Sequence, residues 1–232
     1  FSAAMAAAVS DRSYICSMFA RVEGTFQSKR SKLQELVRML RAVCPGLGSQ
    51  KELFHYEAVL KHESSIRERI HAWCELAKED EKSDSYVAGG VFHLLRYGKP
   101  LPQDLHSCYV RSYDTAKVSE NFKDLMGFLG FAFDYEYIEK GVLFQLNPTM
   151  EVKISQTFKM AEGGYEEWEH TPKKFPKGFL AWDQTQWWVV EIRATSAGDS
   201  SKLADAEKAV EGLAEKLSGS FRDMEFYANI QR

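Results

Sequence analysis

The sequence has no Cys-x-x-Cys pair, no His-x-x-x-His pair and no dominant sign of charge. Its four cysteines lie far apart, at Cys16, Cys44, Cys74 and Cys108, with no histidine at metal-ligand spacing. This pattern predicts buried free thiols in a reducing compartment. The chain carries 30 Lys and Arg against 33 Asp and Glu, a formal net charge of −3. Because this balance gives no global basic field, we expect no direct sequence-specific binding to nucleic acid.

A membrane-spanning run is also missing. The Ala-rich stretch from Ser2 to Val9 lacks a basic n-region and is too short to cross a bilayer. We expect residues 1–13 to form a flexible N-terminal segment and residues 14–232 to form one domain. The default expectation is a soluble cytosolic or nuclear protein without a membrane partner.

Motifs of common enzyme classes are absent as well. There is no Gly-x-Ser-x-Gly nucleophile turn. The glycines at Gly46 and Gly48 follow a predicted helix, whereas a dinucleotide-binding loop follows a strand. The sequence therefore predicts no cofactor.

What the sequence does contain is a long series of strand patterns with few helices. Residues 65–76 alternate in a way that favours a strand, although a helix remains an alternative for this run. A Lys140-Gly141 turn is expected to join two strands as a hairpin. Helices are predicted at 33–43, after Ser119 with an apolar stripe at Phe122, Leu125, Met126 and Leu129, and at 201–217. The predicted strands are 14–25, 53–60, 65–76, 91–97, 107–113, 131–139, 142–146, 150–158 and 187–194.

These elements predict an α+β fold that is mainly β. The strands do not alternate one for one with helices, so the pattern does not favour a parallel α/β sheet. The pattern favours a many-stranded antiparallel β-barrel with about three helices packed outside it.

Alternating charges raise the possibility of catalysis inside such a barrel. A metal-dependent triphosphate hydrolase needs acids at i and i+2 on one strand and inward-facing Lys or Arg on several others. Such an enzyme would also have a Glu-x-Glu-x-Lys strand near the N-terminus, which residues 14–23 lack. The stretch from Asp134 to Gly141 is better explained as a half-solvated strand. On it, Tyr135, Tyr137 and Glu139 would share one face, with Asp134, Glu136, Ile138 and Lys140 on the other. Candidate residues for the catalytic alternative are Arg67 and Arg69, Glu136 with Asp134, Glu151 with Lys153, and Glu191 with Arg193.

Large aromatic residues gather in the irregular segment 161–186 and at the start of the next strand. Loops seldom carry so many aromatics unless they pack on the body of the protein or on a partner, and both alternatives stay open. The candidate partner-binding residues are Trp168, Phe175, Phe179, Trp182 and Trp187.

Several short motifs together resemble subunit eighteen of the Mediator head module. They run in order and at matching spacing through the strand that ends at Phe158, and the helix at 33–44 also fits. The motifs are His93–Pro100, Tyr109–Arg111, Ser119–Asn121, Leu129–Phe131, Asp134–Glu136 and Lys140-Gly-x-x-Phe144.

The resemblance implies a barrel distantly akin to triphosphate-tunnel enzymes but without their catalytic residues. It also implies a nuclear, non-enzymatic scaffold in RNA polymerase II transcription. The implied partners are Mediator subunit twenty, a C-terminal helix of subunit eight, other head subunits and RNA polymerase II. A triphosphate-tunnel-type phosphohydrolase is the first alternative, and an RNA-binding barrel, which would need a contiguous basic and aromatic face, is the second.

Overall fold

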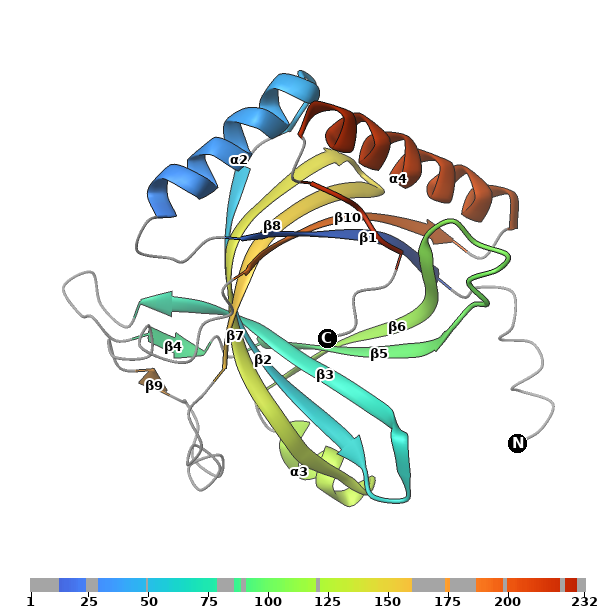
Figure 1. The fold of residues 1–232 in the computed structure, drawn as a ribbon. Helices are drawn as coiled ribbons and strands as arrows, with labels where there is room; N and C mark the ends of the chain where they lie inside the picture. The colour runs from blue at the N-terminus through green and yellow to red at the C-terminus, as the bar shows by residue number, and fades with distance from the viewer. Residues whose placement is uncertain are drawn as a thin grey trace.

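The computed structural model (Figure 1) describes the greater part of the chain, and gaps separate the described ranges. These are residues 13–23, 29–48, 50–78, 86–88, 91–119, 122–159, 174–175, 187–197, 200–221 and 224–228.

Eight antiparallel strands close into a barrel, in the order β2-β7-β8-β10-β1-β6-β5-β3, and β3 pairs back onto β2. The mainly β fold with outer helices is thereby confirmed. The run at 65–76 is a strand, as the alternation favoured. The eight strands are β1 (Ser13–Glu23), β2 (Gln50–His62), β3 (Ser65–Lys78), β5 (Val91–Pro100), β6 (Tyr109–Ser119), β7 (Phe131–Asn147), β8 (Met150–Lys159) and β10 (Trp187–Ala197).

Two short strands extend the sheet beyond the barrel. β4 (Tyr86–Ala88) pairs with the end of β3, and β9 (Lys174–Phe175) pairs with β4. β9 is the described part of the aromatic segment between β8 and β10.

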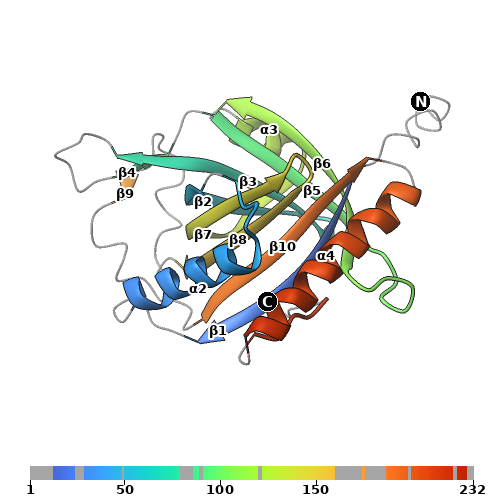
Figure 2. The same ribbon diagram turned by 90° about the horizontal axis from the view of Figure 1, so that it is seen from above.

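Two helices cover the outer face of the barrel (Figure 2), and the main apolar core lies between them and the sheet. α2 (Lys29–Val43) contributes Leu36 and Leu40, whereas α4 (Ser200–Ser220) contributes Val210 and Leu217 along its predicted stripe. The sheet contributes alternate residues of its strands, for example Trp188, Val190, Ile192 and Ala194 of β10. The opposite residues of these strands therefore face the barrel interior.

A second apolar cluster lies beneath the short helix α3 (Phe122–Phe128), where Phe122 and Met126 are buried. Gly130 ends this helix at φ +80°, a conformation that favours glycine. The predicted stripe is only half correct, because Leu125 and Leu129 are about half exposed, at 53% and 49%. The helix is too short to turn a second pair of residues toward the sheet.

The predicted turn at Lys140-Gly141 is wrong, because β7 runs without a break through it. Gly141 is needed for a different reason. A Cβ on this residue would lie 1.9 Å from the backbone oxygen of Ile154 on β8. Glycine here permits close approach of two strands inside the sheet.

The predicted face of Asp134 also needs correction. Tyr135 lies opposite Val59 and Phe133 opposite Leu60, so Asp134 is the extra residue of a β-bulge. Its carboxylate pairs with Lys61 at 3.3 Å and with Arg69 at 3.1 Å. The bulge removes Asp134 from the face that Glu136 and Ile138 share.

The first strand is flanked by three distant segments. β10 pairs with all eleven residues of β1, whereas β6 pairs with Ser13–Ser17 alone. Beyond that point Phe19 and Tyr227 exchange two backbone hydrogen bonds, of 2.9 and 2.8 Å. The segment after α4 thus adds to the edge of β1 that β6 leaves open.

All four cysteines are free thiols, as expected from their spacing. Cys16, Cys74 and Cys108 are buried, and Cys44 is half-buried. Burial raises the pKa of Cys16 to about 12 and that of Cys108 to about 11. Among the described helices, none has the length and apolar character needed to cross a membrane.

Candidate functional site

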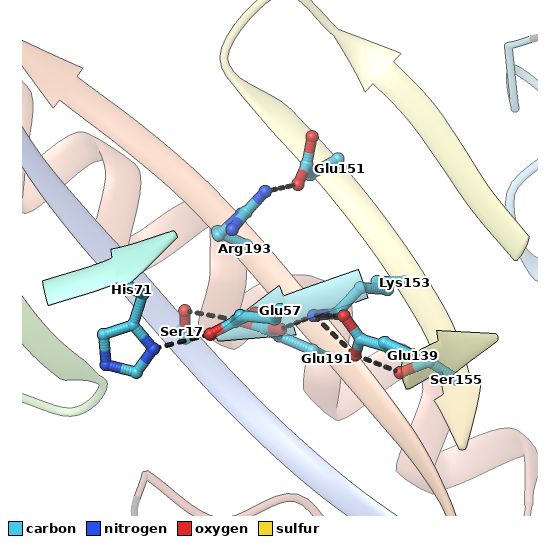
Figure 3. A network of polar contacts seen from close by, with 9 residues as sticks. All are labelled: Ser17, Glu57, His71, Glu139, Glu151, Lys153, Ser155, Glu191 and Arg193. Carbon is cyan, nitrogen blue, oxygen red and sulfur yellow. Dashed lines mark hydrogen bonds and ion pairs between the residues drawn. The ribbon is translucent and has the colours of Figure 1, made fainter. Parts of the chain in front are cut away.

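The inner face of the barrel is polar, and ion pairs and hydrogen bonds link its side chains across neighbouring strands (Figure 3). This follows from the alternation described above, because the outer helices cover the apolar residues of the same strands. A barrel with eight strands leaves an interior just wide enough for side chains to meet across it.

Lys153 of β8 is at the centre of this network. Its ammonium nitrogen lies 2.9 Å from Glu139 of β7 and 3.0 Å from Glu191 of β10. Ser17 of β1 donates a hydrogen bond of 3.1 Å to Glu191, and Ser155 donates one of 2.7 Å to Glu139. Two carboxylates and one ammonium group therefore join β7, β8 and β10, and the Ser17 hydroxyl adds β1 as the fourth adjacent strand.

Arg193, two residues along β10, forms a separate ion pair with Glu151 of β8. Burial alone would lower the pKa of Arg193, but Glu191 and Glu151 outweigh it and raise this pKa above its ordinary value. The guanidinium therefore stays charged and bound to its carboxylate partner.

His71 of β3 and Glu57 of β2 form a further contact of the interior, at 2.5 Å (Figure 3). Burial would raise the pKa of Glu57, but its hydrogen bonds with His71 and Tyr137 lower it below the ordinary value. The ring of His71 also meets the edge of Tyr97 on β5, at 5.2 Å between centroids.

Three rings stack along one row of the inner face. Trp73 of β3 lies between His55 of β2 and His93 of β5, with centroids 4.7 and 4.2 Å away. Burial lowers the pKa of His55, which favours a neutral ring in this stack.

The residues that the sequence offered as catalytic candidates do not all lie together in the structure. Glu151, Lys153, Glu191 and Arg193 lie together in the interior network, as Figure 3 shows. Arg69 and Asp134 form a pair away from it, near the turn between β2 and β3. The side chain of Arg67 lies outside the described residues.

Glu136 does not belong to the interior. It is 8% exposed on the outer face, where Tyr56 donates a hydrogen bond of 2.5 Å to it beneath the apolar cluster of α3. Its spacing from Asp134 suggested a shared face, and the bulge at Asp134 breaks that relationship.

The partner-binding role of the five candidate aromatic residues stays a prediction. Trp168, Phe179 and Trp182 lie outside the described residues. Phe175 is in β9, where its backbone pairs with Tyr86. Trp187 opens β10 opposite Glu23 and is 41% exposed.

Sequence reasoning missed Glu57, His71 and Glu139 as members of the interior network. Each sits at an inward position of its strand, so the alternation of β2, β3 and β7 carried a signal. That signal could not identify partners, because the contacts depend on strand order and register.

Glu139, Glu151 and Glu191 of the network form ion pairs with Lys153 or Arg193 of the same chain. In the described part of the chain, no three His, Cys, Asp or Glu side chains gather as metal ligands. The arrangement ties the strands of the barrel together.

The family model described as "Med18 protein" matches residues 11–225 of the chain. No curated protein matches it. The described fold is similar to a chain in the Schizosaccharomyces pombe Mediator head module, with 16% identity and a TM-score of 0.61. This similarity covers 91% of this chain and 97% of that one. A Pyrococcus horikoshii protein gives 11% identity and a TM-score of 0.52, over 92% of this chain and 94% of its own.

Proposed function

Because this chain belongs to the Med18 family, whose members are subunits of Mediator, we propose that it works as a non-enzymatic scaffold of the Mediator head module. In this role it presents barrel surfaces to other proteins in the nucleus and contributes to RNA polymerase II transcription. The proposed partners are Mediator subunit twenty, a C-terminal helix of subunit eight and other head subunits, with direct or indirect contact to the polymerase.

The family match over residues 11–225 is the observation that carries this proposal. It extends over nearly the whole chain, so it concerns the complete barrel with its outer helices. The shared fold is consistent with it, since this chain and the head-module chain cover each other almost entirely.

The interior network supports a structural role for the charges that first suggested catalysis. Lys153 bridges Glu139 and Glu191, and Arg193 holds Glu151. A polar network whose members are bonded to one another fixes strand register and a single arrangement of the interior. Its carboxylates are therefore assigned to holding the barrel rather than to a reaction.

Affinity purification of the tagged full chain from its own cells, followed by mass spectrometry, tests the proposed function. We expect other head subunits among the co-purifying proteins, in amounts comparable to the tagged chain. Recovery of the chain without any Mediator subunit would refute the assignment.

A further inference from the structure

Four inward-facing residues of β5 and β6 differ from the rest of the barrel interior. They are Tyr97, Tyr109, Arg111 and Tyr113, here called the Arg111 cluster. Residues 109, 111 and 113 alternate with Val110, which is buried in the core beneath the outer helices. Tyr113 pairs with Tyr97 across the two strands.

Arg111 is half-buried, with one face of its guanidinium group covered by Tyr97. The central carbon of the group lies 3.2 Å from the centroid of the Tyr97 ring and 5.3 Å from that of Tyr109. Such stacking contacts the flat face of the group and leaves the N–H bonds at its edge available.

Those N–H donors have no acceptor among the described residues. No ion pair or hydrogen bond joins Arg111 to any side chain in the described part of the barrel, whereas Lys153 and Arg193 each have a carboxylate partner there. A guanidinium group that is partly desolvated and offers five donors can bind an acceptor that a ligand supplies.

The neighbouring hydroxyls offer further donors. Within the described ranges, the hydroxyls of Tyr97, Tyr109 and Tyr113 also have no hydrogen-bond partner, and all three side chains keep some solvent access. Burial raises the pKa of Tyr97 above its ordinary value, so this hydroxyl remains a donor at neutral pH. One cation and three phenols on two adjacent strands form a set of donors suited to an oxyanion.

The surrounding charges favour a carboxylate over a phosphate. Besides Arg111, the carboxylates of Glu57 and Glu191 and the cation Arg193 are close enough to affect the titration of Tyr97, so negative charge is in excess around the cluster. A dianion would be repelled by this excess more strongly than a monoanion. The coplanar N–H bonds of a stacked guanidinium group also match the planar fork of a carboxylate.

We propose that the Arg111 cluster binds the carboxylate of an acidic side chain, supplied by a protein partner that reaches into the barrel interior. The inference that a protein partner supplies this carboxylate rests on the proposed function. The inference that the cluster binds a carboxylate does not.

The site is tested first on the isolated full chain, with sodium acetate as the probe. The Nε–Hε resonance of Arg111 is followed by NMR against sodium chloride at equal ionic strength and against inorganic phosphate. We expect a saturable shift with acetate, at lower concentration than with phosphate. Tyr97→Phe should raise the acetate Kd by about tenfold, because it removes one hydrogen bond to a charged group. Arg96→Gln, on the outer face of β5, should leave the Kd unchanged.

A shift that grows linearly with acetate, or that chloride reproduces, would overturn the site. Tighter binding of phosphate would overturn the choice of carboxylate. The partner is then tested with Arg111→Gln in the co-purification experiment, after its melting temperature has been compared with that of the wild type.

We expect Arg111→Gln, and to a smaller degree Tyr97→Phe, to recover less of at least one head subunit than Arg96→Gln does. If Arg111→Gln no longer binds acetate but recovers the head subunits as well as Arg96→Gln does, the inference that a partner supplies the carboxylate is overturned. A wild-type chain that recovers no Mediator subunit would instead refute the proposed function and leave the acetate result standing.

Discussion

The ammonium group of Lys153 lies 3.0 Å from the carboxylate of Glu191, which is on the neighbouring strand β10. The Lys153 side chain is 14% exposed and also holds Glu139, so removing it leaves two carboxylates without their cation. We expect Lys153→Met to lower the free energy of unfolding by about 3 kcal/mol, as is typical when one partner of a buried pair is lost. Urea denaturation measures this. Lys208→Met, exposed on α4, is the control and should change stability by less than about 0.5 kcal/mol.

The contact between Glu57 and His71 predicts a dependence of stability on pH. The pKa of Glu57 is lower in the folded protein than its ordinary value of 4.5, so its contribution is present above that value. It is lost as the pH falls through the lower, folded pKa. Glu57→Gln should therefore show a smaller loss of unfolding free energy between about pH 5 and pH 3 than the wild type. An unchanged slope, equal to that of the exposed control Glu215→Gln, would contradict the prediction.

Gly141 and Gly212 should respond to alanine in opposite directions. At Gly141 a Cβ would lie 1.9 Å from the backbone oxygen of Ile154, so Gly141→Ala should cost about 2–3 kcal/mol. At Gly212 of α4 nothing lies within 4 Å of the added carbon. Gly212→Ala should stabilise the protein by up to about 1 kcal/mol, because alanine favours the helix. Thermal melting of both variants distinguishes a close approach of strands from a turn at 140–141, where alanine would be tolerated.

Alanine variants of the two adjacent tryptophans of β10 distinguish an effect on partner binding from an effect on stability. Trp187 is 41% exposed, whereas Trp188 is fully buried. Trp187→Ala should weaken co-purification of head subunits with little change in melting temperature. Trp188→Ala should instead destabilise the fold by about 3–5 kcal/mol. If Trp187→Ala lowers the melting temperature and leaves assembly intact, Trp187 is part of the core and not of a partner surface.

A separate prediction compares recovery of head subunits with melting temperature for Trp168 and Trp182. Should they contact a partner, Trp168→Ala and Trp182→Ala will reduce recovery of head subunits without loss of melting temperature. Reduced melting temperature with full recovery would show that the aromatic segment packs on its own barrel.

The phosphohydrolase alternative predicts turnover of inorganic triphosphate with Mg²⁺ or Mn²⁺, and the proposed scaffold predicts none above a protein-free blank. The informative pair of variants is Glu191→Gln, inside the barrel, and Glu136→Gln, on its outer face. Turnover that Glu191→Gln abolishes and Glu136→Gln retains would favour the enzyme.

Local sequence patterns predict much of this fold. Period-two alternation identified β3 although a helix was possible, and the spacing of Leu203, Val210 and Leu217 identified the buried face of α4. The barrel class followed from many strands and few helices.

The features that local patterns could not predict depend on how neighbouring strands are aligned. Glycine at 141 is equally compatible with a turn and with two strands in close contact, and only the position of Ile154 decides between them. Likewise, one extra residue at Asp134 shifts the face of a whole strand segment, and no local signal marks it. The pairing of Glu57 with His71 exists only once β2 and β3 are aligned.

The position of β1 has a consequence for the order of events during synthesis. Strand β1 has β10, β6 and Tyr227 as its neighbours, and β10 begins 164 residues after Glu23, at Trp187. Such distant contacts make folding slow, because the chain between them must be closed into a loop first. We infer that β1 lacks the partner for its whole length until β10 has been synthesised, so that the barrel closes only after that point.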